Sequence, residues 1–255
     1  MTTSDKLENN RNQASTLYRN AMMEQTVAII VAGGSGKRMS SDHPKQYVSL
    51  SGIPILARTL LTFEKALSVG RIVLVVPKDD IGYAKEKIID QYMIHKIKHI
   101  QSGGKTRQDS VRSGLEMVED SDEVVIIHDG VRPFLSKGLI DLSVREAARS
   151  GAVVPVVPLK STLKIIDEDG SIKGTPDRNS IRIAQTPQVF RREIILNAYK
   201  SAYRERYYGT DDASLVERMG IPVTTIPGSY DNIKITTPED LALGELLLKK
   251  IGKKI

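Results

Sequence analysis

Short aliphatic runs divide the chain, and segments with apolar residues at helical spacing separate them. Runs rich in valine and isoleucine are typical of strands buried on both faces of a parallel sheet. The predicted strands cover residues 26–31, 71–76, 123–127 and 152–157. The amphipathic segments predict helices over residues 54–67, 82–91, 107–118, 137–150, 192–206 and 211–219.

The last part of the chain continues this pattern. A strand is expected near residues 223–226 and a final helix from Thr237, because Pro238, Glu239 and Asp240 suit the first turn of a helix. Strand–helix alternation with short connections predicts an α/β fold with a Rossmann-like, mostly parallel sheet and helices on both faces. Ligands of such sheets bind beyond the carboxyl ends of the strands.

Residues 159–183 break the alternation. Short β-like runs flank a turn at residues 167–170, which predicts a protruding β-hairpin arm instead of another βα unit. Residues 26–255 are otherwise expected to form a single domain. Residues 1–25 are polar and lack the apolar core of a signal peptide, so we expect a flexible N-terminal extension.

The composition of the chain excludes several kinds of chemistry and partner, but it says little more about the fold. The chain has no cysteine, which excludes disulfides, cysteine-based zinc sites and thiol catalysis. Its net charge is +6, but the basic residues are scattered instead of forming the stripe of a nucleic-acid interface. We therefore expect phosphorylated small molecules as partners, and no nucleic acid. No stretch reaches the roughly 18 apolar residues of a membrane span, so we expect no membrane partner and a cytoplasmic location.

A glycine-rich loop with three cations follows the first predicted strand: Ala32-Gly33-Gly34-Ser35-Gly36, then Lys37, Arg38 and Lys45. Glycines let successive backbone N–H groups approach phosphate oxygens. The loop is not a Walker A motif, because Val31 stands where the first glycine should be and Arg38 follows the lysine. It is not a dinucleotide fingerprint either, because Met39 replaces the third glycine.

This loop, with the following Pro44-Lys45-Gln46, resembles the signature of nucleotidyltransferases that activate sugars and sugar alcohols. Two further segments closely resemble the 2-C-methyl-D-erythritol 4-phosphate cytidylyltransferase family: GGKTRQDSV at 103–111 and VIIHDGVRP at 125–133. The family's remaining motifs follow in order as TPDR at 175–178, QTPQ at 185–188, GTDDAS at 209–214 and DNIKIT at 231–236. The resemblance spans about residues 26 to 248.

The resemblance implies a site for CTP and a divalent cation, Mg²⁺. Gly104 and Ser110 would contact the cytosine ring, and Asp129 and Asp231 would be the metal contacts. His128 is expected to be structural and not catalytic. The implied nucleotide-binding residues are Ala32, Gly33, Gly34, Ser35, Gly36, Gly104, Arg107, Ser110, Asp129 and Gly130.

The resemblance also implies the catalytic and acceptor-binding residues. Arg38 and Lys45 would stabilise the charge that develops at the α-phosphorus, as expected for a reaction driven by electrostatic positioning. Arg178 and Lys234 would hold the acceptor phosphate, and Thr162 and Thr186 would complete the acceptor site. In the family the arm crosses into a partner subunit, so a homodimer is expected in which each site borrows Arg178 from its neighbour.

Two positions depart from the family's usual pattern. Gly130 stands where the family more often has alanine, and Ser161 stands where aspartate is common. The first departure is mild and lies inside an otherwise matching segment. The second puts one acceptor contact in doubt but not the chemistry.

The expected reaction transfers CMP from CTP to 2-C-methyl-D-erythritol 4-phosphate, giving 4-diphosphocytidyl-2-C-methyl-D-erythritol and pyrophosphate for non-mevalonate isoprenoid synthesis. Three alternatives stay open. A ribitol 5-phosphate cytidylyltransferase shares the loop and the histidine–aspartate and NIK motifs, although residues 107–111 and 175–178 favour the methylerythritol family. Another nucleotidyltransferase would use UTP or GTP. The third alternative, of a different class, is a non-catalytic nucleotide-binding protein.

Overall fold

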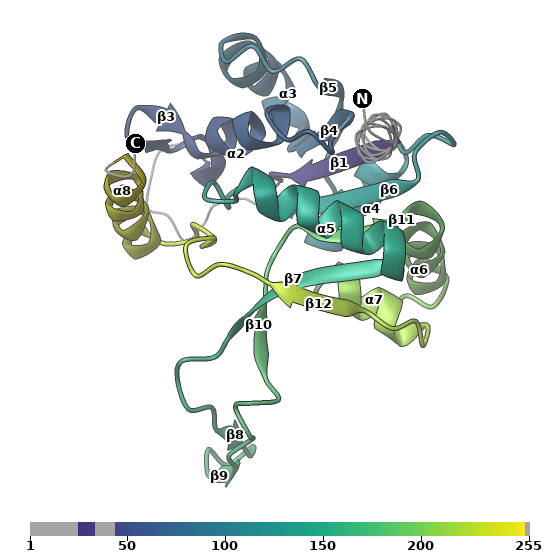
Figure 1. Ribbon diagram of the computed structural model, residues 1–255, viewed down its shortest axis with the longest axis vertical. Coiled ribbons are helices and arrows are strands. Elements are labelled where there is room, and N and C mark those ends of the chain that lie inside the picture. The colour runs from purple at the N-terminus through teal and green to yellow at the C-terminus, as the bar shows by residue number, and fades with distance from the viewer. Residues whose placement is uncertain (1–24, 34–43, 253–255) are drawn as a thin grey trace, which may run out of the picture.

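Strand β1 (Thr26–Val31) is entirely buried and lies inside the main sheet. The structure is a computed structural model that describes residues 25–33 and 44–252 (Figure 1). In it β1 pairs in parallel with β4 (Arg71–Val76) on one side and with β6 (Val124–Asp129) on the other. The expected extension at residues 1–25 lies, except for Gln25, outside the described residues.

The sheet continues on both sides of these three strands in the order β10-β7-β11-β6-β1-β4-β5. On one edge β5 (Ile97–Ser102) pairs in parallel with β4. On the other side β11 (Gln188–Arg191) runs antiparallel to both β6 and β7 (Ala152–Pro158). Two more strands pair with β7: β10 (Arg182–Ala184) antiparallel and β12 (Thr224–Pro227) parallel. The predicted mostly parallel α/β fold is confirmed.

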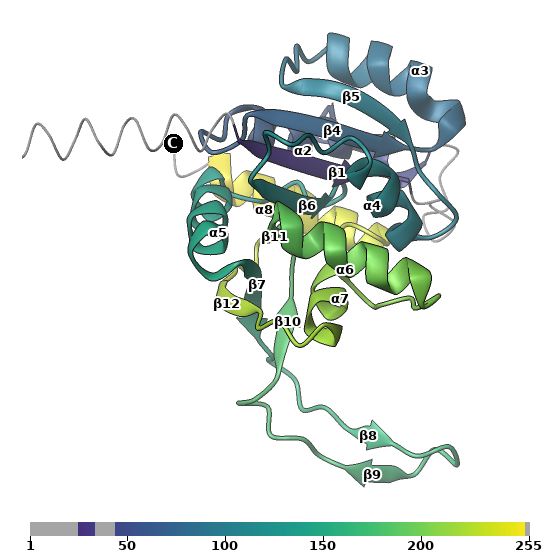
Figure 2. The same cartoon turned by 90° about the vertical axis from the view of Figure 1, so that its right-hand side faces the viewer.

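Helices cover both faces of this sheet, which explains its continuous aliphatic strands. Ala28 and Ile30 of β1 pack in one core with α2 (Ile55–Glu64) and α5 (Lys137–Ser150). The alternate β1 residues pack on the opposite face against α4 (Arg107–Leu115), α6 (Arg192–Arg204) and α7 (Asp212–Arg218). Figure 2 shows α5 and α6 on opposite sides of the sheet.

The predicted helix over 82–91 is the one that differs most in form. It begins with the 3-10 turn η2 (Lys78–Asp80) and the short α3 (Ile81–Tyr83) and continues as the π-helical segment η3 (Ala84–Asp90). The other helices differ from the predicted ranges only at their ends. Among the described helices, none has the length and apolar composition that crossing a membrane requires.

A small third core fixes the C-terminal part of the chain. Helix α8 (Pro238–Gly252) packs through Leu247 against a hairpin made by β2 (Ser49–Leu50) and β3 (Ile53–Pro54). Ile235 joins the same core, and its backbone N–H donates to the Val131 carbonyl at 2.9 Å. The segment before α8 is thereby held next to the loop that follows β6, which positions Lys234.

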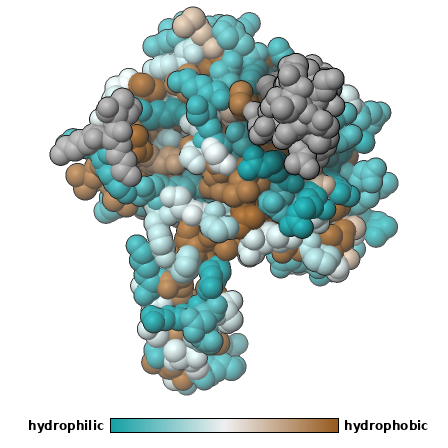
Figure 3. Space-filling view, in the orientation of Figure 1, coloured by the Kyte–Doolittle hydropathy of each residue, from teal (hydrophilic) through white to brown (hydrophobic). Residues whose placement is uncertain are grey.

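The predicted arm is a β-hairpin that projects from the body (Figures 1 and 2). Strands β8 (Ile165–Ile166) and β9 (Ile172–Gly174) pair antiparallel, and Gly170 supplies the positive φ of +86° at the turn between them. Leucine and isoleucine side chains of the arm are solvent-exposed in the single chain (Figure 3). An arm this far from the body buries little of its own apolar surface.

Gly114 lets α4 approach the sheet closely, and it supports a stability prediction. A Cβ there would lie 2.5 Å from Ile29 Cγ2 and 3.1 Å from Val75 Cγ2. We expect Gly114→Ala to lower the free energy of unfolding by about 1–3 kcal/mol through overpacking, despite the better helix propensity of alanine. The measurement is urea unfolding followed by circular dichroism.

Gly138 in α5 is the matched control. Nothing lies within 4 Å of its added Cβ, so Gly138→Ala should be neutral or stabilise by up to about 1 kcal/mol. Equal stability changes in the two variants would contradict the close packing of α4 on β1 and β4.

Candidate active site

A cavity of about 450 Å³ opens beyond the carboxyl ends of β1 and β6, as the fold class predicts. Its volume lies in the range of small-molecule sites. Val31 and Asp129, the last residues of these strands, are register partners and both line it. The structure brings together here the predicted residues Ala32, Gly33, Lys45, Gly104, Arg107, Ser110, Asp129 and Lys234.

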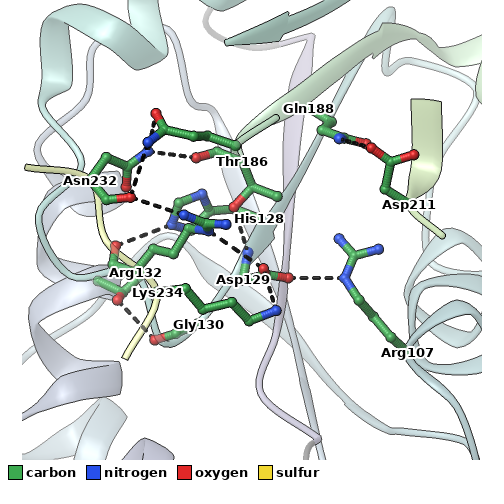
Figure 4. Close-up of polar contacts among 12 residues, drawn as sticks. Arg107, His128, Asp129, Gly130, Arg132, Thr186, Gln188, Asp211, Asn232 and Lys234 are labelled. Atoms are coloured by element: carbon green, nitrogen blue, oxygen red, sulfur yellow. Dashed lines mark hydrogen bonds and ion pairs between the residues drawn. The ribbon is translucent and has the colours of Figure 1, made fainter. Parts of the chain in front are cut away.

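The carboxylate of Asp129 is the centre of this cavity's charge network (Figure 4). Asp129 Oδ1 accepts a hydrogen bond from Arg107 Nε at 2.9 Å, and Asp129 Oδ2 lies 2.8 Å from Lys234 Nζ. Arg132 Nε is 3.5 Å from the same Oδ2. Burial favours the protonated acid, but the three cations outweigh it and hold the pKa of Asp129 well below its usual range. Asp129 is therefore ionised at neutral pH.

The cavity as a whole is positively charged. Its lining includes the cations Lys45, Lys105, Arg107 and Lys234 against the single carboxylate of Asp129, a difference of +3. A concave surface with one sign of charge concentrates ligands of the opposite sign. The described part of the cavity is thus suited to a polyanion such as a triphosphate.

His128 is buried next to Asp129 but does not line the cavity. Burial, together with the nearby guanidinium of Arg132, lowers the pKa of His128 to about 3, although Asp129 opposes the shift. The neutral ring places Nε2 3.3 Å from the Arg132 carbonyl oxygen, and the ring packs 5.1 Å from that of Phe63. These contacts agree with the expected structural role.

The loop before α4 is held in shape by its own hydrogen bonds. Thr106 caps the helix in a reciprocal capping box with Asp109. Ser110 Oγ accepts from the Gly104 N–H at 3.1 Å and donates to the Thr106 carbonyl at 2.9 Å. Because the Ser110 hydroxyl already donates its proton to the Thr106 carbonyl, it can only accept a hydrogen bond from a nucleobase, through its remaining lone pair. A Cβ at Gly104 would lie 2.4 Å from Asp109 Cβ, so this turn requires glycine.

Thr186 lies beside Asp129 and is buried. Its Oγ1 accepts from the Asp129 backbone N–H at 3.2 Å, which leaves the hydroxyl proton for another acceptor. Asn232 Nδ2 donates to the Thr186 carbonyl at 2.9 Å and so ties this segment to the one that carries Lys234. Thr186, predicted as an acceptor contact, thus lies beside the charge network, although it does not itself line the cavity.

Other predicted residues lie elsewhere. Thr162 and Arg178 are exposed on the arm, outside the cavity of their own chain. Asp231 does not line the cavity either, and its carboxylate pairs with Lys250 Nζ at 3.0 Å. Gly130 follows Asp129 without lining the cavity. Gly34, Ser35, Gly36 and Arg38 lie outside the described residues.

The residues present limit how a magnesium ion could be held. No group of three or more acidic or histidine side chains suited to a metal occurs among the described residues. Asp129 is the one carboxylate lining the described cavity. Mg²⁺ commonly uses one or two protein carboxylates and completes its octahedron with water and substrate phosphates. The donor set fits an ion that arrives with a triphosphate, and it does not support Asp231 as its second contact.

Sequence reasoning missed a residue that is connected directly to this network. Asp212, at the start of α7, is fully buried and pairs with the Arg107 guanidinium. The motif that contains it, residues 209–214, was recognisable, but a contact between residues 105 positions apart in the chain leaves no local signal. Arg132 likewise appeared only as part of the motif at 125–133, and sequence reasoning gave it no role of its own.

The chain is similar over most of its length to known proteins of one family. The family model described as 2-C-methyl-D-erythritol 4-phosphate cytidylyltransferase matches residues 26–250. A protein of that name from Syntrophus aciditrophicus is 51% identical over 90% of this chain and 98% of its own length. One from Clostridium novyi is 47% identical over 90% and 99%. The crystal structure of a 4-diphosphocytidyl-2C-methyl-D-erythritol synthase from Anaerococcus prevotii superposes with a TM-score of 0.80, at 35% identity, and covers 90% of this chain and 99% of that one.

The buried neutral state of His128 predicts a pH dependence of stability. Its pKa is lower in the folded chain than in the unfolded chain, where histidine titrates near 6.5, so its contribution is present above that value and is lost as the pH falls. Between pH 7 and pH 5 we expect a loss of about 2 kcal/mol in the free energy of unfolding from this residue. The loss should be absent in His128→Gln.

The comparison is made by urea unfolding at both pH values. His95→Gln, at an exposed histidine, serves as the control and should retain the wild-type pH dependence. If His128→Gln loses as much stability on acidification as the wild type does, the ring is not held neutral.

Proposed function

The chain belongs to the 2-C-methyl-D-erythritol 4-phosphate cytidylyltransferase family, and we propose that the cavity around Asp129 is where it joins CTP to this acceptor. The reaction transfers CMP from CTP to 2-C-methyl-D-erythritol 4-phosphate and releases pyrophosphate. The observation that supports this site most strongly is the buried Asp129 carboxylate with its cations at the carboxyl ends of two neighbouring strands.

In the proposed mechanism a phosphate oxygen of the acceptor attacks the α-phosphorus of CTP. A new P–O bond forms, the bond to the β-phosphate oxygen breaks, and pyrophosphate leaves with the electron pair. The nucleophile is already an anion, so no side chain has to remove a proton. The chain's contribution is orientation and charge neutralisation, which dominate catalysis of phosphoryl-type transfer.

The residues divide between the two substrates. The backbone at Ala32 and Gly33 and the side chain of Lys45 hold the triphosphate, with Arg38 as a further cation. Lys234 holds the acceptor phosphate beside Asp129, and Thr186 contacts the acceptor with its remaining hydroxyl proton. Gly104 and Ser110 face the cytosine and select it through backbone and hydroxyl groups.

Asp129 is also the residue that would hold the Mg²⁺ accompanying the triphosphate. When bound, the ion neutralises phosphate charge and so lowers the barrier to attack at phosphorus. Asp129 suits this role because its cationic neighbours keep it ionised. Before the nucleotide binds, the same carboxylate separates Arg107 from Lys234 and keeps both side chains in place.

The arm makes a homodimer part of the proposal. Ile165, Ile166 and Ile172 expose 49%, 54% and 62% of their surface in the single chain, a cost that a partner subunit would remove. Arg178 lies on this arm, outside its own cavity. An arm that crosses to a partner would bring Arg178 to the acceptor phosphate there. We also propose a cytoplasmic location.

Substrate choice is the direct test of this function. With CTP and Mg²⁺, we expect rapid pyrophosphate release with 2-C-methyl-D-erythritol 4-phosphate, little with ribitol 5-phosphate, and little when UTP or GTP replaces CTP. Lys45→Ala should lower kcat by about 100- to 1,000-fold, because it removes a charge next to the reacting phosphates. Lys85→Ala, at an exposed lysine outside the cavity, is the control.

Each failure of this assay has a definite meaning. Faster turnover with ribitol 5-phosphate would assign the protein to ribitol activation, and Ser161 would be the first residue to exchange. No pyrophosphate with any acceptor would indicate a non-catalytic nucleotide-binding protein. Near-normal turnover of Lys45→Ala would remove Lys45 from the mechanism.

A mixed dimer tests whether Arg178 acts in the neighbouring subunit. Lys45→Ala and Arg178→Ala chains, each nearly inactive alone, are co-expressed with different tags and purified as the heterodimer. If the arm crosses, one of its two sites has both residues intact, so about half of the wild-type activity returns. If Arg178 serves its own cavity, each site of the heterodimer lacks one residue and activity stays low.

A further inference from the structure

Asp212 is a buried carboxylate that the proposed mechanism does not use. None of its surface is exposed, and it does not line the cavity. Its side-chain partners among the described residues are the Arg107 guanidinium and the Tyr199 hydroxyl. Among these partners Arg107 lines the cavity, so Arg107 connects Asp212 directly to the site.

Arg107 is held between two carboxylates at different ends of its guanidinium. Nε donates to Asp129 at 2.9 Å, while Nη1 and Nη2 donate to the two oxygens of Asp212 at 3.1 and 2.8 Å. This bidentate pairing fixes the plane of the guanidinium. Figure 4 shows Nε of Arg107 turned toward Asp129, with the Gln188–Asp211 pair on the side of its terminal nitrogens. Arginine has five N–H donors, so two remain for a ligand.

The chain holds Asp212 itself in a fixed position. Tyr199, on α6, donates its hydroxyl to Asp212 Oδ1 at 2.6 Å. Gln188 accepts from the Ala213 N–H at 2.9 Å and donates to Asp211 Oδ2 at 2.7 Å, which attaches the start of α7 to β11. The same start is also anchored through the residue next to Arg107, because Gln108 accepts from the Gly209 N–H at 2.9 Å.

Stability alone does not account for this arrangement. A buried ion pair costs so much desolvation that apolar residues of similar size often serve a fold equally well. Here the pair adjoins the cavity, and 30% of the Arg107 side chain is exposed toward solvent. The hydrogen bonds around Asp212 converge on the orientation of one cation that lines the cavity.

We propose that Asp212 is a positioning residue for the transfer reaction, holding Arg107 in the orientation in which its remaining N–H groups meet the phosphates of CTP. This inference rests on the proposed function and extends it to a residue outside the cavity. Without the Asp212 carboxylate, only the Nε contact with Asp129 would hold Arg107, and its guanidinium would be free to turn about that contact. The nucleotide would then meet a misplaced cation.

The test is a double-mutant cycle on the full chain. Asp212→Asn should raise the KM for CTP about tenfold, lower kcat by a few fold and leave the KM for the acceptor within about twofold. Tyr199→Phe should have a smaller effect in the same direction. In the Arg107→Met background both changes should alter kcat/KM for CTP by less than about twofold, because the side chain they position is gone.

Asp122→Asn is the matched control. Asp122 is also a buried carboxylate paired with an arginine, Arg71, but neither residue lines the cavity. This change removes a comparable ion pair and should leave the KM for CTP unchanged. An Asp212→Asn effect that persists undiminished in Arg107→Met would assign Asp212 a purely structural role and overturn the proposal. An Asp212→Asn variant with wild-type kinetics would overturn it as well.

Calorimetric titration with CTP distinguishes a failure of the Asp212 proposal from a failure of the proposed function. The wild type could bind CTP and yet release no pyrophosphate. The positioning role would then be decided by the dissociation constants for CTP of the wild type, the two single variants Asp212→Asn and Arg107→Met, and the double variant. In that case Asp212→Asn should weaken CTP binding about tenfold only when Arg107 is present. A wild type that neither binds CTP nor turns it over would contradict both proposals.

Discussion

The arrangement of the candidate site depends on one interaction, the buried carboxylate of Asp129 with three cations around it. An ionised carboxylate in an apolar interior is costly unless it is paired and hydrogen-bonded. The cations come from α4, from the loop after β6 and from the segment before α8. A capping box fixes the start of α4. A backbone hydrogen bond from Ile235 to Val131 joins the segment before α8 to the loop after β6. Asp129 is where their positions converge.

The same carboxylate makes a positive cavity compatible with a stable fold. Arg107, Arg132 and Lys234 would repel one another across the short distances that separate them. A shared counter-charge keeps them in place before any ligand arrives. A triphosphate entering the cavity therefore meets cations that are already oriented, and little reorganisation is needed at the moment of reaction. His128, kept neutral by burial, adds no further charge.

Long, strongly patterned segments could be predicted from the sequence, and short ones could not. The predictions for β1, β4 and α5 match the observed ranges, because hydrophobic periodicity alone determines them. Strands β10 and β11 have three and four residues, and their pairing depends on β6 and β7, which local patterns do not show. Strand β5 was missed because it carries polar residues at the exposed edge of the sheet.

The same distinction applies to the site. The motifs singled out Gly104, Asp129 and Lys234, and these three residues line one cavity: Asp129 ends β6, Gly104 follows β5 and Lys234 precedes α8. The Arg107–Asp212 pair could not be foreseen, since it depends on how α7 packs against α4. The expectation for Asp231 did not account for Lys250, which the last turns of α8 bring within 3.0 Å of its carboxylate.

Two residues, Gly130 and Ser161, depart from the family's usual pattern. Neither residue contributes a side chain to the charge network around Asp129. Gly130 adjoins Asp129, but its backbone is fixed from both sides: its N–H donates to the Val31 carbonyl at 2.8 Å and its carbonyl accepts from Thr59 Oγ1 at 2.9 Å. A Cβ at Gly130 would lie only 3.0–3.2 Å from Leu56, Ala32 and Val31. Glycine therefore suits the close packing of this chain and leaves Asp129 in position. Ser161 is exposed where the arm leaves the body. A change there can alter how an acceptor is recognised, whereas the cations that meet the triphosphate are held by other parts of the chain.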